Sequence, residues 1–181
     1  MHDLTTARSA PFIATSAAMR AMPPATRYIL RGGPQVRSAA QAALGFTVPE
    51  IACRAGGGGE RAALWLGPDE WLLIAPVRLA SALPALLHRA LGGLPHSLVD
   101  VSHRQTALAL SGPQAPTLLA AGCPLDLDAS AFPVGMCTRT MLAKAEIVLW
   151  RTGSLEFRVE VWRSFAAYVS QFLAEAARGI I

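Results

Sequence analysis

Three neighbouring residues of this sequence, Asp100, Ser102 and His103, have the side-chain types of a hydrolytic catalytic triad. In such a triad the nucleophile is hydrogen-bonded to a general base, and a third group orients that base. Side chains of adjacent residues on an extended strand point to opposite faces, so Ser102 and His103 do not readily converge. We therefore predict no catalytic residue in this cluster.

A structural role suits the charged residues of this region better. Asp100 and Arg104 lie among apolar segments, and a buried charge without a partner costs several kcal/mol. We expect Asp100 and Arg104 to join a buried polar network or to meet a partner chain. Asp100, His103, Arg104 and Arg139 are thus predicted as structural or interface polar residues.

A run of four glycines, Gly56 to Gly59, could in principle cradle a phosphate group. A phosphate-binding loop continues with Lys-Ser or Lys-Thr and a helix, whereas Glu60, Arg61 and an apolar strand follow here. Because glycine increases the freedom of the backbone, we interpret the run as a loose loop before a hairpin. No cofactor-binding residue is predicted on this chain.

The three cysteines, Cys53, Cys123 and Cys137, are odd in number and lack the spacing of metal ligands. No pair of histidines or carboxylates has ligand spacing either, so we predict no metal site. The N-terminal residues lack the apolar core segment of a signal peptide. We expect three reduced thiols in a cytoplasmic protein.

The composition indicates a chain that hides part of its surface in a complex. Hydrophobic residues make up 52% of the 181 residues and charged residues only 15%, against a usual charged share of about a quarter. No uninterrupted apolar run reaches the roughly 18 residues of a membrane-spanning helix, so no membrane contact is expected. The interfaces of obligate complexes are as apolar as a protein core. The low share of charged residues therefore favours a chain that is part of a permanent protein complex.

The basic residues also favour a protein partner. The net charge is +4, and Lys144 is the only lysine beside many arginines. A nucleic-acid-binding protein gathers such charge in a stripe or a tail, whereas these arginines are scattered between apolar segments. Arginine forms bidentate pairs with carboxylates at interfaces. We expect no nucleic-acid partner, and an RNA-binding module is the weaker alternative.

The elements that carry these residues occur in two similar series. Each begins with a strand, a Gly-Pro-Gln junction and a helix that ends at a glycine. The matching segments are strands 28–31 and 106–110, helices 34–44 and 115–121, and glycines Gly45 and Gly122. Each series then continues with a hairpin and an amphipathic helix. These are hairpins 62–75 and 146–161 and helices 79–91 and 165–173.

The two series predict an α+β fold, with mostly antiparallel sheets covered by helices on one side. The repeated unit is strand–helix–hairpin–helix, and residues 96–101 predict a buried strand between the two copies. Residues 1–26 are predicted as an N-terminal arm. Residues 27–181 are predicted as one domain of two subdomains, about 27–103 and 104–181.

Several separated motifs resemble the gamma subunit family of heterotetrameric sarcosine oxidase. The longest runs from residue 99 to 127 and reads V-D-V-S-H-R-Q-T-A-L-A-L-S-G-P-Q-A-P-T-L-L-A-A-G-C-P-L-D-L. Others read A-L-W-L-G-P-D-E-W-L-L from 63, A-F-P-V-G-M-C-T-R-T from 131, A-E-I-V-L-W-R from 145 and F-R-V-E-V-W-R-S-F from 157. They stand in the family's order, and the resemblance covers roughly residues 27–173.

The chain is also distantly similar to the folate-dependent aminomethyltransferases of glycine cleavage. The similarity lies in Asp100-Val101-Ser102-His103, followed by Ser-Gly-Pro and a helix. It implies a fold of two interlocked α+β subdomains. Those enzymes bind tetrahydrofolate with an extra domain and an acidic pair on a strand, where this chain has Ala145 and Glu146. The resemblance therefore implies a scaffold without that site, any remnant of which would lie near Glu146.

The family resemblance implies a non-catalytic, structural gamma subunit. The whole complex would oxidatively demethylate sarcosine to glycine, forming hydrogen peroxide and either formaldehyde or 5,10-methylenetetrahydrofolate. FAD, FMN, NAD, tetrahydrofolate and zinc are expected on the other subunits, and the alpha, beta and delta subunits are the expected partners. The alternative is an independent folate-dependent one-carbon transferase.

Overall fold

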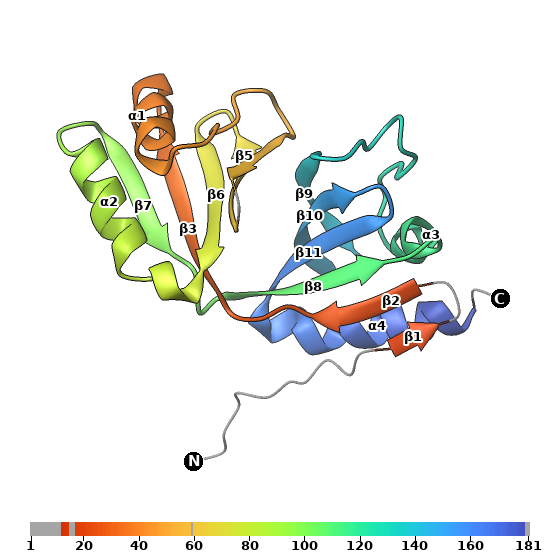
Figure 1. Cartoon of the computed structure of the whole chain (residues 1–181). Coiled ribbons are helices and arrows are strands. Elements are labelled where there is room, and N and C mark those ends of the chain that lie inside the picture. The colour runs from red at the N-terminus through yellow and green to blue at the C-terminus, as the bar shows by residue number, and fades with distance from the viewer. Residues whose placement is uncertain (1–11, 15–16, 59, 180–181) are drawn as a thin grey trace, which may run out of the picture. The chain divides into compact units, whose positions relative to one another are not determined.

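The computed structural model describes residues 12–14, 17–58 and 60–179, which form two units, each with its own β-sheet (Figure 1). The five-stranded unit contains Pro24–His103 and Gly135–Thr138. The six-stranded unit contains the described N-terminal residues as far as Pro23, Arg104–Val134 and the chain from Arg139 on. Along the chain, the long segment of the five-stranded unit thus ends at His103, and that of the six-stranded unit begins at Arg104.

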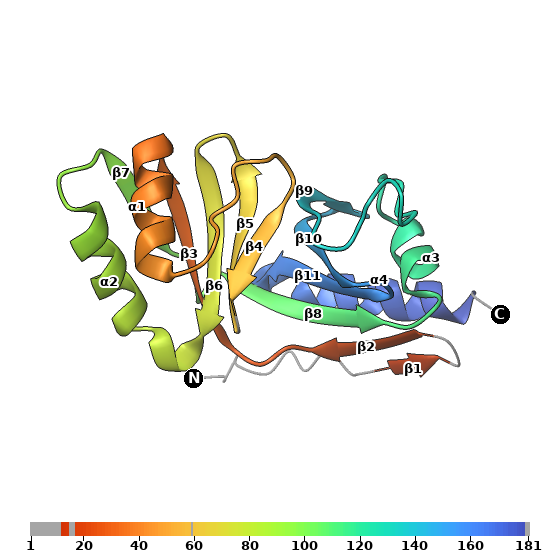
Figure 2. The same ribbon diagram turned by 45° about the horizontal axis from the view of Figure 1, so that its top comes forward.

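The five-stranded unit carries its two helices on one side of the sheet (Figure 2). Its elements are β3 (Ala25–Gly32), α1 (Pro34–Leu44), β4 (Ala55–Gly58), β5 (Arg61–Gly67), β6 (Glu70–Pro76), a 3-10 turn (Val77–Leu79), α2 (Ala82–Leu91) and β7 (His96–Asp100). Neighbouring strands are antiparallel in the order β4-β5-β6-β3-β7. Buried residues of both helices pack with those of β3 and β6 in one apolar cluster that includes Trp71.

The helix α1 forms where its sequence predicts it. Pro34 is its first residue, a position at which the missing N–H of proline is not needed. Val36, Ala40 and Leu44 follow at intervals of four and are all buried. Gly45 ends the helix in the left-handed conformation with φ 73°, which glycine adopts without the cost of a Cβ clash.

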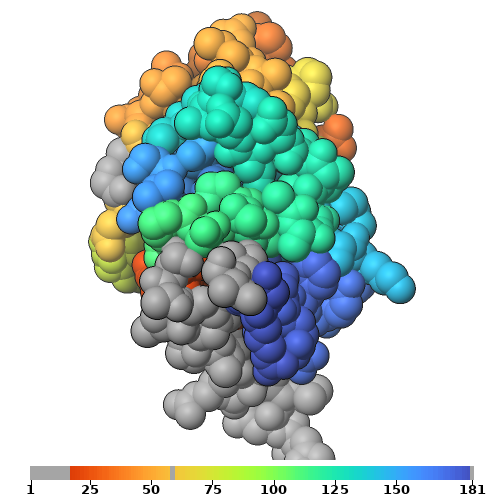
Figure 3. All heavy atoms as spheres, turned by 90° about the vertical axis from the view of Figure 1, so that its right-hand side faces the viewer, coloured from red at the N-terminus to blue at the C-terminus, as the bar shows by residue number. Residues whose placement is uncertain are grey.

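The six-stranded unit is assembled from both ends of the chain. Its elements are β1 (Phe12–Ala14), β2 (Ala17–Ala21), β8 (Gln105–Ser111), α3 (Ala115–Ala120), β9 (Cys137–Leu142), β10 (Ala145–Gly153), β11 (Glu156–Trp162), a 3-10 turn (Arg163–Phe165) and α4 (Ala166–Arg178). The sheet order is β1-β2-β8-β11-β10-β9. Figure 3 shows α3 and the connection after it, in green to cyan, beside the dark blue α4.

The two sheets have corresponding strand orders. In one, β8, β11, β10 and β9 lie side by side, and in the other β3, β6, β5 and β4 do so. In each sheet, the strand that starts the series, β3 or β8, has one further neighbour. This neighbour stands in the chain just before the series of the other sheet. β2, just before β3 in sequence, pairs with β8, and β7, just before β8, pairs with β3. The chain therefore exchanges one strand between its two units.

The N-terminal segment differs from the arm predicted over residues 1–26. Residues 1–11 and 15–16 lie outside the described part of the chain. In the described part, β1 pairs with β2, and β2 pairs with β8. Ala17 and Met19 of β2 are buried. The pairing partner of β2 is far away in sequence, so the local pattern does not reveal this strand.

The glycine run also differs from its prediction, since it is not a loose loop. Ala55–Gly58 forms β4 and pairs with β5, while Gly59 lies outside the described residues. A Cβ on Gly56 would come within 1.9 Å of the Thr47 carbonyl oxygen. Glycine is needed here for close packing of the backbone rather than for flexibility.

Strand β7 is correctly placed but is not buried as predicted. It lies at the edge of the five-stranded sheet, beside β3. Ser97, Val99 and Asp100 are exposed. An apolar run does not distinguish a central strand from an edge strand, because that depends on which strands pair.

Candidate functional site

Asp100, at the end of β7, organises a polar turn. Its Oδ1 accepts a hydrogen bond from the Ser102 N–H at 2.8 Å, and the Tyr28 hydroxyl donates to its Oδ2 at 3.4 Å. Burial pushes the pKa of Asp100 upward, but hydrogen bonds from Ser102 and Tyr28 and the charge of His103 outweigh it, so the pKa lies below its ordinary value. Asp100 is an ionised carboxylate at neutral pH.

The Ser102 hydroxyl joins this turn to strand β3. Its Oγ accepts a hydrogen bond from the Arg27 N–H at 2.9 Å and donates to the Arg27 carbonyl at 3.4 Å. Both polar functions of the hydroxyl therefore serve the backbone of Arg27. His103 is exposed at the end of the turn. The geometry is that of a structural connection and not of a nucleophile bonded to its base.

Arg104 and Arg139 lie at the surface, and Asp100 is exposed as well. Of the two roles predicted for Asp100 and Arg104, burial in a polar network within this chain is not observed, and contact with a partner chain stays a prediction. The Arg104 guanidinium lies over the Trp162 ring, 5.2 Å from its centre. The carbonyl of Arg104 accepts a hydrogen bond from the Arg163 N–H at 2.8 Å. Arg139 is exposed on β9. The structure therefore presents Arg104 together with an aromatic ring at the end of β11.

The buried arginine of the six-stranded unit is Arg151, which is 4% exposed. Its Nη1 donates to the carbonyls of Phe132 at 2.9 Å and Leu127 at 3.2 Å, and Nη2 donates to the carbonyl of Ser154. Its guanidinium also lies 5.0 Å from the centre of the Phe157 ring. Arg151 thus fixes the connection after α3 by donating hydrogen bonds to the backbone carbonyls of Leu127 and Phe132.

Sequence reasoning missed Arg151 as a buried charge, although a signal was present. Ile147, Leu149 and Arg151 alternate along β10 and face the same side, and all three are buried. The same alternation on β11 places Arg158 beside Glu160, whose carboxylate is fully buried. Arg158 Nε donates to Glu160 Oε1 at 2.7 Å. Buried charges of this kind have structural partners.

Ala145 and Glu146, which the sequence similarity aligns with the acidic pair expected in the aminomethyltransferases, lie at the start of β10. Ala145 is completely buried there, and Glu146 is exposed. The side chain of alanine has no carboxylate and no other hydrogen-bonding group. The residues present at this position therefore do not fit a tetrahydrofolate site.

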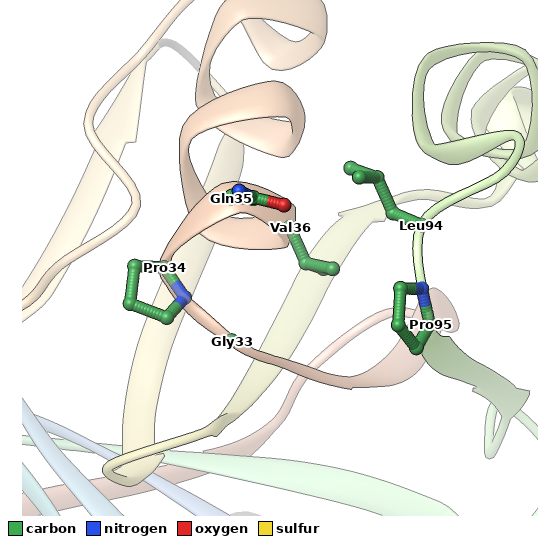
Figure 4. Close-up of a pocket in the computed structure, with 6 residues that line it drawn as sticks. All are labelled: Gly33, Pro34, Gln35, Val36, Leu94 and Pro95. Carbon is green, nitrogen blue, oxygen red and sulfur yellow. The ribbon is translucent and has the colours of Figure 1, made fainter.

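The described surface is hollowed beside α1 and beside α3. One hollow of about 330 Å³ lies between the start of α1 and the loop before β7 and is lined mainly by apolar groups, with Val36 and Leu94 facing it (Figure 4). Another of about 490 Å³ lies beside α3, with Thr117, Asp126 and Arg151 in its lining. The Arg151 donors already serve backbone carbonyls, so this hollow lacks a free guanidinium for an anion.

The described residues contain neither a cluster of metal ligands nor a helix that could span a membrane. Within them, no group of three or more His, Cys, Asp or Glu side chains is arranged to hold a metal ion. No described helix is long and apolar enough to cross a membrane.

Comparison with known proteins places these features in a family. Residues 31–179 match the model of the "Sarcosine oxidase, gamma subunit family". A sarcosine oxidase subunit gamma from an Arthrobacter species is 38% identical over 164 residues, which cover 90% of this chain and 75% of that protein.

Solved structures agree with the sequence comparison. A heterotetrameric sarcosine oxidase from Corynebacterium sp. U-96, in complex with pyrrole 2-carboxylate, matches with a TM-score of 0.87 and 32% identity over 95% of this chain and 89% of that chain. The aminomethyltransferase T of the glycine cleavage system from Bartonella henselae matches with a TM-score of 0.67 and 16% identity, over 90% of this chain and 49% of that chain. The second match shows a shared fold.

Proposed function

This chain belongs to the sarcosine oxidase gamma subunit family, and we propose that it is a structural, non-catalytic subunit of a heterotetrameric sarcosine oxidase. The observation that carries the proposal is the likeness of nearly the whole chain to a chain of a solved heterotetrameric sarcosine oxidase. Its partners are then the alpha, beta and delta subunits of a cytoplasmic complex.

The reaction proposed for the whole complex is the oxidative demethylation of sarcosine to glycine. Hydrogen peroxide forms, together with formaldehyde or 5,10-methylenetetrahydrofolate. FAD, FMN, NAD, tetrahydrofolate and zinc belong to the other subunits in this proposal. This chain contributes surface and rigidity to the contact between them.

Two observations support a non-catalytic role for this chain. The Ser102 hydroxyl is hydrogen-bonded to the backbone of Arg27, which leaves it without the arrangement of an activated nucleophile. Ala145 is buried, at a position that the sequence similarity matches to a carboxylate of the aminomethyltransferases. The fold shared with those enzymes therefore serves here as a scaffold without the folate site.

The contact with partners is proposed to include Arg104 and Trp162 as anchors. Tryptophan and arginine are enriched among residues that dominate binding energy at interfaces. The two side chains stack, and both are exposed in the single chain. Arg139 is proposed as a further anchor that reaches an acidic group of a partner.

The two units are proposed to descend from one duplicated strand–helix–hairpin–helix segment. The corresponding strand orders of the two sheets support this proposal, as does the exchange of β2 and β7. The test is a superposition of Ile29–Leu44 on Leu108–Ala121. A common strand–helix path is expected, and unrelated paths would end the idea.

Co-expression tests the proposed function. The four subunits are produced with and without this chain, and the complexes are compared by size-exclusion chromatography and by sarcosine-dependent oxygen consumption. We expect an assembled, active complex only when this chain is present, and no oxygen consumption by the chain alone. Full assembly and activity without it would refute the structural role.

A further inference from the structure

Cys53 and Cys137 lie opposite each other although 84 positions separate them in the sequence. Arg54 and Met136 form an isolated antiparallel bridge. In an antiparallel pair, the residue before one partner faces the residue after the other, so Cys53 faces Cys137. The Cys137 N–H donates to the Cys53 carbonyl at 3.0 Å, which confirms the register. Both residues belong to the five-stranded unit, although Cys137 is also the first residue of β9 in the six-stranded sheet.

The backbone spacing of this pair suits a covalent bond. Residues that face each other with a hydrogen bond between them have Cα atoms about 5.5 Å apart. Disulfides join residues whose Cα atoms are about 4.4 to 6.8 Å apart. Both thiols are free in the structure, and Cys137 Sγ donates to the Trp65 carbonyl at 3.7 Å. This weak contact breaks when Sγ turns toward Cys53.

Cys53 also has an unusual backbone. Its φ is 58°, and Ala143 is the other residue besides glycine with a positive φ in the described chain. A left-handed conformation is costly for a residue with a Cβ, and such residues are frequent where a side chain has a specific role. Glycine or asparagine would adopt this conformation more easily. The presence of cysteine here points to a use for its thiol.

The two thiols differ in accessibility. Cys53 is half-buried and can be reached from solvent, whereas Cys137 is completely buried. Burial raises the pKa of Cys137 to about 12, and the neighbouring Cys53 thiol adds to this effect. An oxidant therefore reacts first at Cys53, and Cys137 is protected from direct oxidation.

We propose that Cys53 and Cys137 form a peroxide-driven disulfide that joins the segment Gly135–Thr138 covalently to the Pro24–His103 part of the five-stranded unit. Hydrogen peroxide oxidises the Cys53 thiol to a sulfenic acid and is itself reduced to water. The Cys137 sulfur then attacks the Cys53 sulfur, the S–S bond forms, and the sulfenic hydroxyl leaves as a second water with the Cys137 proton. A dithiol reductant reverses the bond by thiol–disulfide exchange.

The source of the oxidant rests on the proposed function, because an oxidase complex releases hydrogen peroxide beside this chain. The thiol pair itself does not depend on that function. The segment that the bond would lock is the part of the chain that leaves the six-stranded unit between Val134 and Arg139. The disulfide would therefore hold in the five-stranded unit a short segment whose neighbours on both sides in the sequence belong to the six-stranded unit.

The test is oxidation of the full chain with reagent hydrogen peroxide, followed by alkylation and peptide mass spectrometry without reduction. We expect a Cys53–Cys137 linkage and the loss of two of the three free thiols, with recovery in dithiothreitol. The control variant Cys123→Ser keeps the linkage. In Cys137→Ala, Cys53 proceeds to sulfinic acid, because its resolving partner is absent. Circular dichroism verifies that each variant is folded.

Three results would overturn the proposal: sulfinic acid at Cys53 of the wild type without linkage, dimers joined through Cys53, or a linkage to Cys123. A second arm uses the assembled complex with sarcosine in place of reagent peroxide, with and without catalase. Linkage that catalase suppresses supports the oxidase as the source. If the disulfide forms with reagent peroxide but not with sarcosine, the pairing of Cys53 with Cys137 is supported. The same result contradicts the oxidase reaction as the source of the peroxide.

Discussion

The guanidinium of Arg104 stacks on the ring of Trp162, with 5.2 Å between the guanidinium carbon and the ring centre. Arg104 is the turn residue just before β8, and Trp162 ends β11, where it pairs with Gln105, the first residue of β8. Both side chains are exposed, and Trp162 keeps 41% of its surface accessible. A stacked guanidinium is held in place while its edge stays free for a carboxylate.

Trp162→Ala is predicted to weaken assembly with the other subunits. Truncating a central aromatic residue of an interface costs about 2 kcal/mol or more, which is roughly a 30-fold loss of affinity. Binding of the purified variant to the remaining subunits measures this loss. Leu155→Ala is the matched control, since Leu155 is similarly exposed, at 40%, in the β10–β11 turn. If both variants lose the same affinity for the remaining subunits, Trp162 is not a specific anchor of the interface.

Arg104→Ala and Arg139→Ala are predicted to reduce assembly as well. Each removes a guanidinium that can pair with a carboxylate of a partner, and an unpaired buried carboxylate is costly. The assembled complexes are compared with wild type by yield and melting temperature. Arg31→Ala is the control, because Arg31 forms an exposed pair with Asp69, worth at most about 1 kcal/mol. Wild-type assembly by both variants would show that these are solvated surface charges.

Arg151→Ala is predicted to destabilise the chain strongly. It removes the donors to the Leu127 and Phe132 carbonyls and the contact with Phe157. Hydrogen bonds from a charged donor are worth about 1.5 to 3 kcal/mol each, so we expect a loss of at least about 3 kcal/mol. Urea denaturation measures the free energy of unfolding. Arg178→Ala should change it by less than about 0.5 kcal/mol, since Arg178 pairs with Glu175 at the surface.

Gly56→Ala is predicted to destabilise the five-stranded unit. The added Cβ would lie 1.9 Å from the Thr47 carbonyl oxygen, so the backbone must move. Such overpacking costs about 1 to 3 kcal/mol. Gly67→Ala is the control, because its Cβ would meet only the Glu70 Cβ at an ordinary 3.6 Å. If thermal unfolding shows the same stability for both variants, the close approach at Gly56 does not limit packing.

Cys137 is predicted to make stability fall at alkaline pH. Burial raises its pKa from 9.0 to about 12, so between these values the folded chain keeps a proton that the unfolded chain releases. Stability therefore falls as pH rises from 9 to 12, by at most about 1.4 kcal/mol per pH unit from this group. Urea midpoints for wild type and Cys137→Ala at several pH values measure the difference. Cys123→Ala should retain the wild-type slope.

Ala145→Asp is predicted to destabilise the fold without creating folate binding. Ala145 is fully buried at the start of β10, and an unpaired buried carboxylate costs several kcal/mol. Glu146→Ala changes an exposed residue and serves as the control. Thermal unfolding and tetrahydrofolate titration are the measurements. Folate binding by either the wild type or Ala145→Asp would favour the independent one-carbon transferase.

The sequence by itself determined the elements whose signals are local. Pro34 and Gly45 bound α1, and the alternating residues on both sides of Gly67 predict the β5–β6 hairpin that the structure contains. These predictions hold because turn residues and apolar periodicity act over a few neighbouring positions. The family motifs likewise indicated the relationship that the comparisons show.

Only the tertiary structure decided which distant segments meet. The exchange of β2 and β7, the close approach at Gly56 and the facing of Cys53 and Cys137 all join residues far apart in sequence. Tertiary packing also buried Arg151 and left Arg104 exposed. Strand pairing and burial depend on the whole set of packed surfaces, and the spacing of residues along one chain does not encode that set.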